Sequence, residues 1–155
     1  MLYLDSSALM KRYVIEKGSD ALSARFERGE NIYTSLLSFG EIHAALARAF
    51  RMKRLTAEDL IRSREAFLND WLFGISAIEV NVHTMTALPA LVENYLLKAA
   101  DAIHLSAAIW LRDRFRLLGH QPVPKDEVEF GVADTHLCKA AAKCGLPVFN
   151  PELFD

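Results

Sequence analysis

Cysteine, excess positive charge and long apolar runs are all scarce in this chain. Only two of its 155 residues are cysteines, Cys138 and Cys144, and they lie six positions apart without CxxC spacing, which predicts reduced thiols. A net charge of −2 argues against a nucleic-acid binder with a wholly basic surface. No apolar run approaches the roughly 18 residues of a membrane span, and no basic secretion-signal segment precedes the first apolar residues. We therefore expect a cytoplasmic protein without membrane contact.

Several catalytic motifs are also absent. The histidines form neither HExxH nor another zinc-binding spacing, so a zinc site has little support. The chain has no P-loop and no GxGxxG, which excludes the corresponding nucleotide-binding folds. GxSxG is missing as well, although Ser6, Ser7, Asp101 and His104 could be assembled on paper into a triad. We interpret His104, one helical turn from Asp101, as a hydrogen-bonded core residue in preference to a catalytic base.

The pattern of apolar residues predicts an α/β fold. Hydrophobic residues make up 52% of the chain, enough for the core of a single domain over residues 1–155. Short apolar runs alternate with longer amphipathic stretches, as in β-α units with a parallel sheet. The expected strands are 2–4, 32–34, 78–82, 129–133 and 147–150.

The expected helices lie between these strands. They start at about residue 7, cover 20–27, start at 38, cover 55–67, start at 89 and cover 135–144. A long helical face is lined by Leu96, Ala100, Ile103, Ala107 and Trp110, and this helix carries Asp101. Prolines and charges predict a loop over 119–129.

Four acidic residues recur where strands end or along helices that follow them. Asp5 follows the first strand, Asp134 follows strand 129–133, Glu41 follows the second strand, and Asp101 lies on the long helix. Parallel α/β sheets bind their ligands at the carboxyl ends of the strands. The positions of these acids therefore predict a site at that edge.

Each acid also has a purely structural explanation. Asp5 and Asp134 fit helix N-caps, and Ser38 to Glu41 fits a capping box in which Glu41 bonds back to the Ser38 backbone. Asp101 shares a helical line with Leu97 and Leu105, four residues to either side, which leaves its carboxylate half desolvated. An ion pair with Lys98 is the structural alternative for Asp101.

Convergence of the four acids would imply a bound cation. Four carboxylates at one edge repel each other unless a divalent ion joins them, and ligation by oxygen alone suits Mg²⁺ or Mn²⁺ better than zinc. Such an ion activates water and stabilises charge on phosphoryl oxygens, so phosphodiester hydrolysis is the leading chemistry.

Basic residues gather in two segments. One group lies in 48–64 and contains Arg48, Arg51, Lys53, Arg54, Arg62 and Arg64; the second contains Arg112, Arg114 and Arg116. A solvated helix face is the favoured interpretation. Phosphate contacts by Arg48, Arg51, Arg112 and Arg114 are the alternative.

Four blocks of sequence together resemble the PIN-domain nucleases, and most closely their VapC-like toxin branch. The blocks are Leu2-Tyr3-Leu4-Asp5-Ser6-Ser7-Ala8-Leu9, the segment 34–41, Leu97-Lys98-Ala99-Ala100-Asp101-Ala102-Ile103-His104-Leu105, and Val132-Ala133-Asp134-Thr135-His136-Leu137. Each contains one of the four acids, and they occur in the family's order over nearly the whole chain. The resemblance implies a PIN-like three-layer α/β/α fold with a central, mainly parallel sheet.

The resemblance also implies a function and a set of site residues. It implies a metal-dependent endoribonuclease, the toxin of a toxin-antitoxin pair, with Asp5, Glu41 and Asp101 holding Mg²⁺ or Mn²⁺. Asp134 would act through water or hold the helix start. Hydroxyls of Ser7, Ser6 and Thr34 would orient the metal shell or the RNA phosphate, and Arg48 and Arg112 would contact substrate. A cognate antitoxin in the active-site groove and a homodimer are the implied partners.

Two departures and two rivals accompany this interpretation. The segment 112–129 is long for such a toxin, and Lys98 stands where arginine is frequent. A catalytically silent PIN-like module that acts through protein partners is the first rival, and the intact acids argue against it. The second is a phosphoacceptor domain, for which the chain offers no convincing lysine.

Overall fold

One parallel sheet lies at the centre of the computed structural model, which describes residues 1–117 and 128–154. Its strand order is β3-β2-β1-β4-β5, and every neighbouring pair is parallel. The strands are β1 (Leu2–Leu4), β2 (Ile32–Ser35), β3 (Ile75–Ile78), β4 (Glu129–Gly131) and β5 (Val148–Phe149). The first strand of the chain is thus the central strand of the sheet.

Seven α-helices and two 3₁₀ turns complete the described part of the chain. They are α1 (Ser6–Leu9), η1 (Met10–Arg12), α2 (Ser19–Glu27), α3 (Leu37–Arg51), α4 (Ala57–Phe73), α5 (Leu88–Tyr95), α6 (Ala99–Leu117), α7 (Thr135–Lys143) and η2 (Pro151–Leu153). The helices expected near residues 7, 20, 38, 55, 89 and 135 are all present, with their ends shifted by a few residues.

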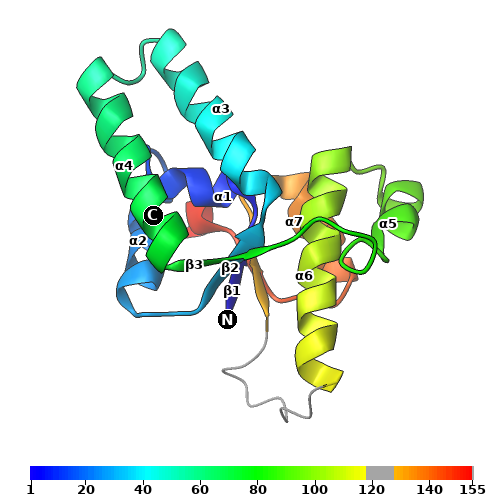
Figure 1. Cartoon of the computed structure of the whole chain (residues 1–155). Helices are drawn as coiled ribbons and strands as arrows, with labels where there is room; N and C mark the ends of the chain where they lie inside the picture. Colours follow the sequence, from blue (N-terminus) through cyan, green and yellow to red (C-terminus); the bar gives the residue numbers. More distant parts are fainter. Residues whose placement is uncertain (118–127, 155) are drawn as a thin grey trace.

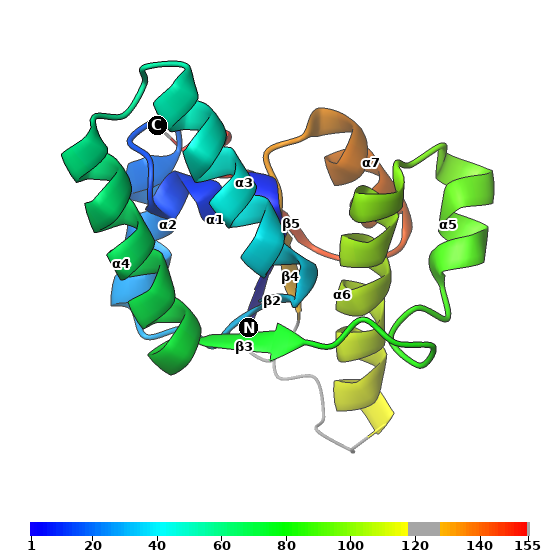
Figure 2. The same cartoon turned by 45° about the horizontal axis from the view of Figure 1, so that its top comes forward.

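Side chains of β1 alternate between two apolar cores, one on each face of the sheet. Leu2 and Leu4 enter a core covered by α1 to α4, whereas Tyr3 enters the core under α5, α6 and α7. All three are fully buried, and burial of each leucine contributes about 1.5–3 kcal/mol. Figures 1 and 2 show these two groups of helices on opposite sides of the strands. The predicted three-layer α/β/α fold is confirmed.

Helices α3 and α4 form an antiparallel hairpin that extends beyond the sheet (Figure 1). Thr56 and Asp59 form a capping box at the start of α4. The buried ring of Phe67 packs against the rings of Tyr13 and Trp71 and ties this hairpin to the core. The hairpin therefore holds α3 at a defined place beside the sheet.

The prediction of a strand over 78–82 was wrong, because β3 ends where that strand was expected to begin. Gly74 is the C-cap of α4, and the next four residues pair in register with all of β2, from Ile75 opposite Ile32 to Ile78 opposite Ser35. Beyond Ile78 the chain turns: Thr84 donates a hydrogen bond to the Glu79 carbonyl at 2.7 Å. That local bond competes with extended structure.

The prediction of one long helix that starts at residue 89 and carries Asp101 was also wrong, because the structure has two helices, α5 and α6, and Leu96 lies between them. Leu96 has a left-handed backbone (φ 51°) at the C-terminal end of α5, is 85% exposed, and precedes the start of α6 at Ala99. Strands β4 and β5 are shorter than expected. Most of the predicted loop 119–129 lies outside the described residues.

Both cysteines are free thiols, as predicted. Among the described residues, no helix combines the length and apolar character needed to cross a bilayer.

Candidate active site

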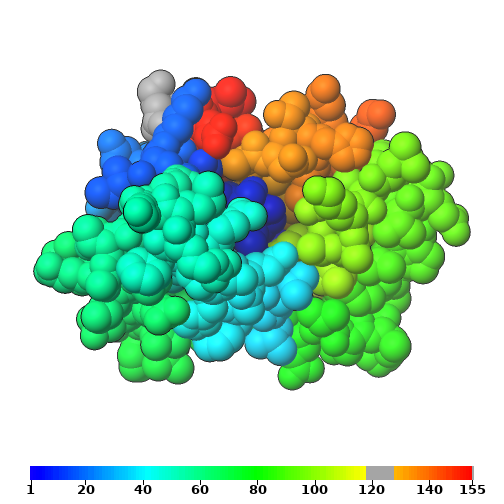
Figure 3. All heavy atoms as spheres, turned by 90° about the horizontal axis from the view of Figure 1, so that it is seen from above, coloured from blue at the N-terminus to red at the C-terminus, as the bar shows by residue number. Residues whose placement is uncertain are grey.

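The four acids come from four different elements that meet at the carboxyl edge of the sheet. Asp5 follows β1 and Asp134 follows β4; these two strands pair in register, with Leu4 opposite Gly131. Glu41 lies on α3, which follows β2, and Asp101 lies in the first turn of α6. Seen from above in Figure 3, the first residues of the chain form the floor of a hollow between α3 on one side and α6 and α7 on the other.

Asp5 is both a helix cap and a buried carboxylate. Its Oδ1 accepts hydrogen bonds from the Ser7 hydroxyl at 2.8 Å and from the Ala8 backbone at 3.0 Å. Only 5% of the residue is exposed. Burial raises the pKa of Asp5, although the nearby His104 and the Ser7 hydrogen bond act in the opposite direction. An acid that is desolvated to this degree and lies at a sheet edge is a candidate functional group.

Glu41 does not form the capping box that its spacing permits. The N-cap of α3 is Leu36, which makes no side-chain cap, and Ser38 lies inside the helix. The Glu41 carboxylate instead accepts hydrogen bonds from the Ser6 hydroxyl and from His104 Nε2, the latter at 2.9 Å. Burial alone would raise the pKa of Glu41, but the bonds from His104 and Ser6 outweigh it and lower that pKa.

Asp101 differs from Asp5 in that the charges of other acids, as well as burial, raise its pKa. Burial is the largest of the effects that raise its pKa, and the charge of Asp134 raises the pKa further. The charge of Lys98 acts in the opposite direction. Leu105 beside it on the helix is fully buried and Leu97 is 8% exposed, as the sequence pattern predicted. Within the described part of the chain, the ion pairs do not include one between Asp101 and Lys98. The ion-pair alternative is therefore not formed.

Asp134 is exposed and caps α7, since its Oδ1 accepts a hydrogen bond from the Leu137 backbone at 2.8 Å. Its charge nevertheless acts on Asp101. Cys138 lies near both strand-end acids: burial raises the pKa of its thiol, and the charges of Asp134 and Asp5 raise it further. Asp134 thus both caps α7 and lies close enough to the other acids for its charge to act on Asp101.

The chemistry of this donor set fits a hard divalent cation. All four acids present oxygen, and the mutual repulsion seen at Asp101 is what a cation relieves. Within residues 1–117 and 128–154, no three histidine, cysteine, aspartate or glutamate side chains are grouped closely enough to hold a metal ion directly. Mg²⁺ keeps several of its waters and needs only one or two direct carboxylates, so a site of this type fits the ion.

The hydroxyl groups expected at the site divide into two kinds. Ser7 donates to Asp5 and accepts the Ala133 backbone N–H at 3.1 Å, and Ser6 donates to Glu41. Both line the site. Thr34 is fully buried, and its hydroxyl donates to the Leu4 carbonyl at 2.6 Å, so it joins β2 to β1 underneath the acids.

The two candidate arginines lie in different surroundings. Arg48 is exposed on α3 and, together with Ser6, Ser7 and Glu41, lines a groove of about 400 Å³; Glu41 is the one of the four acids in its lining. Arg112 lies eleven residues beyond Asp101 on α6, about 16 Å along a helix. Its guanidinium donates to the Cys144 carbonyl at 2.7 Å and so ties α6 to the end of α7.

Sequence patterns did not identify Tyr3, Lys11 or Ser38 as part of the site or its groove. Tyr3 bonds to His104 at 3.2 Å; its hydroxyl in a fully buried strand was a usable signal, because such a group needs a partner. Lys11 lines the groove and is 4% exposed, and its ammonium group forms ion pairs with Glu16 and Glu152. Ser38 lies within 3.1 Å of Ser6.

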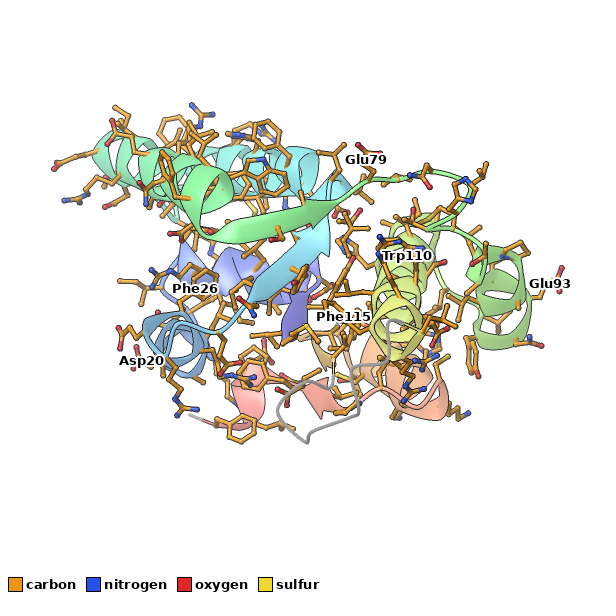
Figure 4. All side chains as sticks on the ribbon, turned by 60° about the horizontal axis from the view of Figure 1, so that its bottom comes forward. Asp20, Phe26, Glu79, Glu93, Trp110 and Phe115 are labelled. Carbon is orange, nitrogen blue, oxygen red and sulfur yellow. The ribbon has the colours of Figure 1, made fainter. Side chains whose placement is uncertain are left out.

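A second, larger cavity of about 680 Å³ lies between β3 and the outer half of α6. Figure 4 shows Trp110 and Phe115 on α6 and Glu79 after β3, which all line it. The four acids are not among its lining residues.

Residues 2–115 match the PIN domain, and the chain therefore belongs to the PIN domain family. This confirms the family that the four sequence blocks predicted. The family match covers Asp5, Glu41 and Asp101, whereas Asp134 lies beyond it.

The chain is similar to two curated proteins. They are Ribonuclease VapC45 of Mycobacterium tuberculosis (strain CDC 1551 / Oshkosh) and Ribonuclease VapC49 of Mycobacterium tuberculosis (strain ATCC 25618 / H37Rv), each 29% identical over 113 residues, or 73% of this chain and 78% of the relative. Among solved structures, a chain of the crystal structure of FitAcB from Neisseria gonorrhoeae has a TM-score of 0.58 at 16% identity, with 97% of this chain and 98% of that chain covered. This last likeness supports the fold.

Proposed function

We propose that this protein is a VapC-like, metal-dependent endoribonuclease, the toxin of a toxin-antitoxin pair. The observation that carries the proposal is the placement of acids from four separate elements at the carboxyl edge of the sheet, where the charges of Asp134 and Glu41 also act on the partly buried Asp101. Both similar curated proteins are named ribonucleases. A structural role alone would not gather like charges at one edge.

The proposed roles follow from the contacts of each side chain. Asp5, Glu41 and Asp101 would hold Mg²⁺ or Mn²⁺, one or two of them directly and the rest through the waters of the ion, and Asp134 would support them. When bound, such an ion supplies an activated water for in-line attack on a phosphodiester and neutralises the charge that develops on the phosphate oxygens. Ser7 holds the Asp5 carboxylate in place by its 2.8 Å hydrogen bond.

The groove beside the acids supports an RNA substrate. Arg48 and Arg54 line it together with Ser6, Ser7 and Glu41, so a phosphate in the groove would lie beside cationic side chains and one of the four acids. Arg54 also pairs with Glu16 at 3.0 Å, which leaves Arg48 as the better phosphate contact.

The proposed protein partners are a cognate antitoxin in this groove and a second copy of the chain. Large apolar side chains exposed on α4 support a protein contact there: Ile61, Leu68, Leu72 and Phe73 are 40 to 83% exposed. We propose that the protein acts in the cytoplasm, where its RNA substrate lies, as one PIN-like domain over residues 1–155.

The test is cleavage of a structured RNA by purified protein, first in EDTA and then with added Mg²⁺ or Mn²⁺. The key variant is Asp5→Asn, with Asp20→Asn as the matched control, because Asp20 is exposed on α2 (Figure 4). Cleavage restored by metal in the parent and in Asp20→Asn but lost in Asp5→Asn supports the proposal. Equal cleavage by all three proteins points to a contaminating nuclease and contradicts the proposed function.

The two rivals give different results in the same preparations. A silent PIN-like module neither binds Mn²⁺ nor cuts RNA, but it still binds a protein partner. A phosphoacceptor is labelled by a small phosphodonor such as acetyl phosphate, and Asp5→Asn would abolish that label.

A further inference from the structure

A buried histidine connects the core to the acidic site. His104 is 2% exposed and lies on α6, and its two ring nitrogens point to partners from different elements. Nδ1 lies 3.2 Å from the Tyr3 hydroxyl on β1, and Nε2 lies 2.9 Å from the Glu41 carboxylate on α3. The Ser6 hydroxyl of α1 lies 3.3 Å from the same Nε2 and also bonds to Glu41.

The donors and acceptors of this network determine the tautomer of a neutral imidazole. A carboxylate can only accept, so the hydrogen between His104 and Glu41 lies on Nε2. Nδ1 is then the acceptor, and the Tyr3 hydroxyl must donate to it. Ser6 has one hydrogen, which it donates to Glu41. With a neutral ring, this arrangement satisfies every polar group in the chain from Tyr3 to Glu41.

The network also restrains a side chain that would otherwise rotate. The Glu41 side chain is 31% exposed and has three rotatable bonds, so its carboxylate needs fixed donors to keep one orientation. His104 is a suitable anchor because its ring is packed edge-on against Tyr3, and the Tyr3 ring in turn stacks on Phe130 with centroids 5.5 Å apart. The rigid centre of the sheet thereby sets the direction of Glu41.

We propose that His104 is a positioning residue that, with its tautomer selected by Tyr3, holds the Glu41 carboxylate in the orientation required for binding a divalent cation. This inference rests on the proposed function. Outer partners of metal-ligating groups change metal affinity or activity by 10- to 100-fold when they are removed.

The sharpest test removes one hydroxyl from the core. Tyr3→Phe keeps the stacked ring and deletes only the donor to Nδ1, and Tyr33→Phe, in the adjacent strand β2, is the matched control. We expect Tyr3→Phe to weaken Mn²⁺ binding about 10-fold in a titration followed by electron paramagnetic resonance. Tyr33→Phe should leave it unchanged, and ¹⁵N NMR of the His104 ring should show Nε2–H in the parent protein.

A second pair of variants guards against a folding defect. The amide nitrogen of Gln in His104→Gln can still donate to Glu41, whereas His104→Leu has no donor at this position. We expect His104→Gln to bind Mn²⁺ more tightly than His104→Leu at matched unfolding midpoints.

The outcomes separate this inference from the proposed function. Parent protein that binds Mn²⁺ and cuts RNA, with affinity unaffected by Tyr3→Phe or with the His104 ring hydrogen on Nδ1 and none on Nε2, overturns the positioning role alone. Parent protein that neither binds Mn²⁺ nor cuts RNA overturns both.

Discussion

Replacement of Asp101 by asparagine should make the metal-free protein more stable while abolishing RNA cleavage. Asparagine has nearly the same shape as aspartate but carries no charge. The Asp101 carboxylate is partly desolvated and is repelled by Asp134 and Glu41, so its charge opposes folding when no cation is present. The same charge is needed to hold the metal.

The magnitude follows from the exposure of the groups involved. Asp134 is exposed and Asp101 is only partly buried, so solvent screens each repulsion to the 0.2–1 kcal/mol range of surface pairs. Two repulsions and some desolvation, less the attraction of Lys98, leave a gain of about 1 kcal/mol. In a protein of this size that gain raises Tm by about 2–4 °C.

The gain should depend on pH in a defined direction. The folded-state pKa of Asp101 lies above its ordinary value of 3.8. The charged Asp101 carboxylate therefore lowers the free energy of unfolding of the wild-type protein at any pH above the folded pKa. This loss of stability disappears as pH falls below 3.8. The difference between Asp101→Asn and wild type should accordingly be present at pH 7 and absent at low pH.

The assay is urea unfolding in EDTA at pH 7 and at pH 3.5, with Asp20→Asn as the control for loss of an exposed carboxylate. Added Mg²⁺ should stabilise wild type by about 1.4 kcal/mol at ten times its Kd and should have a smaller effect on Asp101→Asn. A variant that is less stable than wild type at pH 7, or that still cuts RNA, would refute the assignment of Asp101 to a repulsive acidic site.

Three further predictions test the fold, the groove and the acid stability. Gly131→Ala should destabilise the protein by about 1–3 kcal/mol in urea, because an added Cβ would lie 2.5 Å from a leucine side chain of β1. Arg48→Glu should weaken RNA binding and reduce its salt slope by about one, whereas Arg62→Glu, on α4, should do so less; equal effects would mean a non-specific change in charge. Hydrogen bonds from Arg25 lower the pKa of Glu30, so the stability from this pair is present above the unfolded pKa and lost as pH falls through the folded one. In Glu30→Gln the free energy of unfolding should fall less steeply with decreasing pH than in wild type. An unchanged pH dependence would contradict this role of the Arg25–Glu30 pair.

The sequence alone was enough to predict the α/β class, the buried first strand and the four acids. These features depend on local order: an apolar run followed by an acid and a helix start specifies a strand end, whatever surrounds it. The amphipathic period that exposes one helix face also predicted that Leu105 would be buried beside Asp101. The resemblance to PIN domains rests on the same short blocks and was confirmed over residues 2–115.

Tertiary structure decided which of several locally reasonable bonds formed. Ser38 and Glu41 have the spacing of a capping box, yet Glu41 bonds to His104, 63 residues away, because α3 and α6 meet over the sheet edge. Arg112 has the local sequence of a basic patch, but the packing of α6 on α7 directs it to the Cys144 carbonyl. Spacing along a chain reports which face of an element a residue occupies; only the packing of elements decides what that face meets.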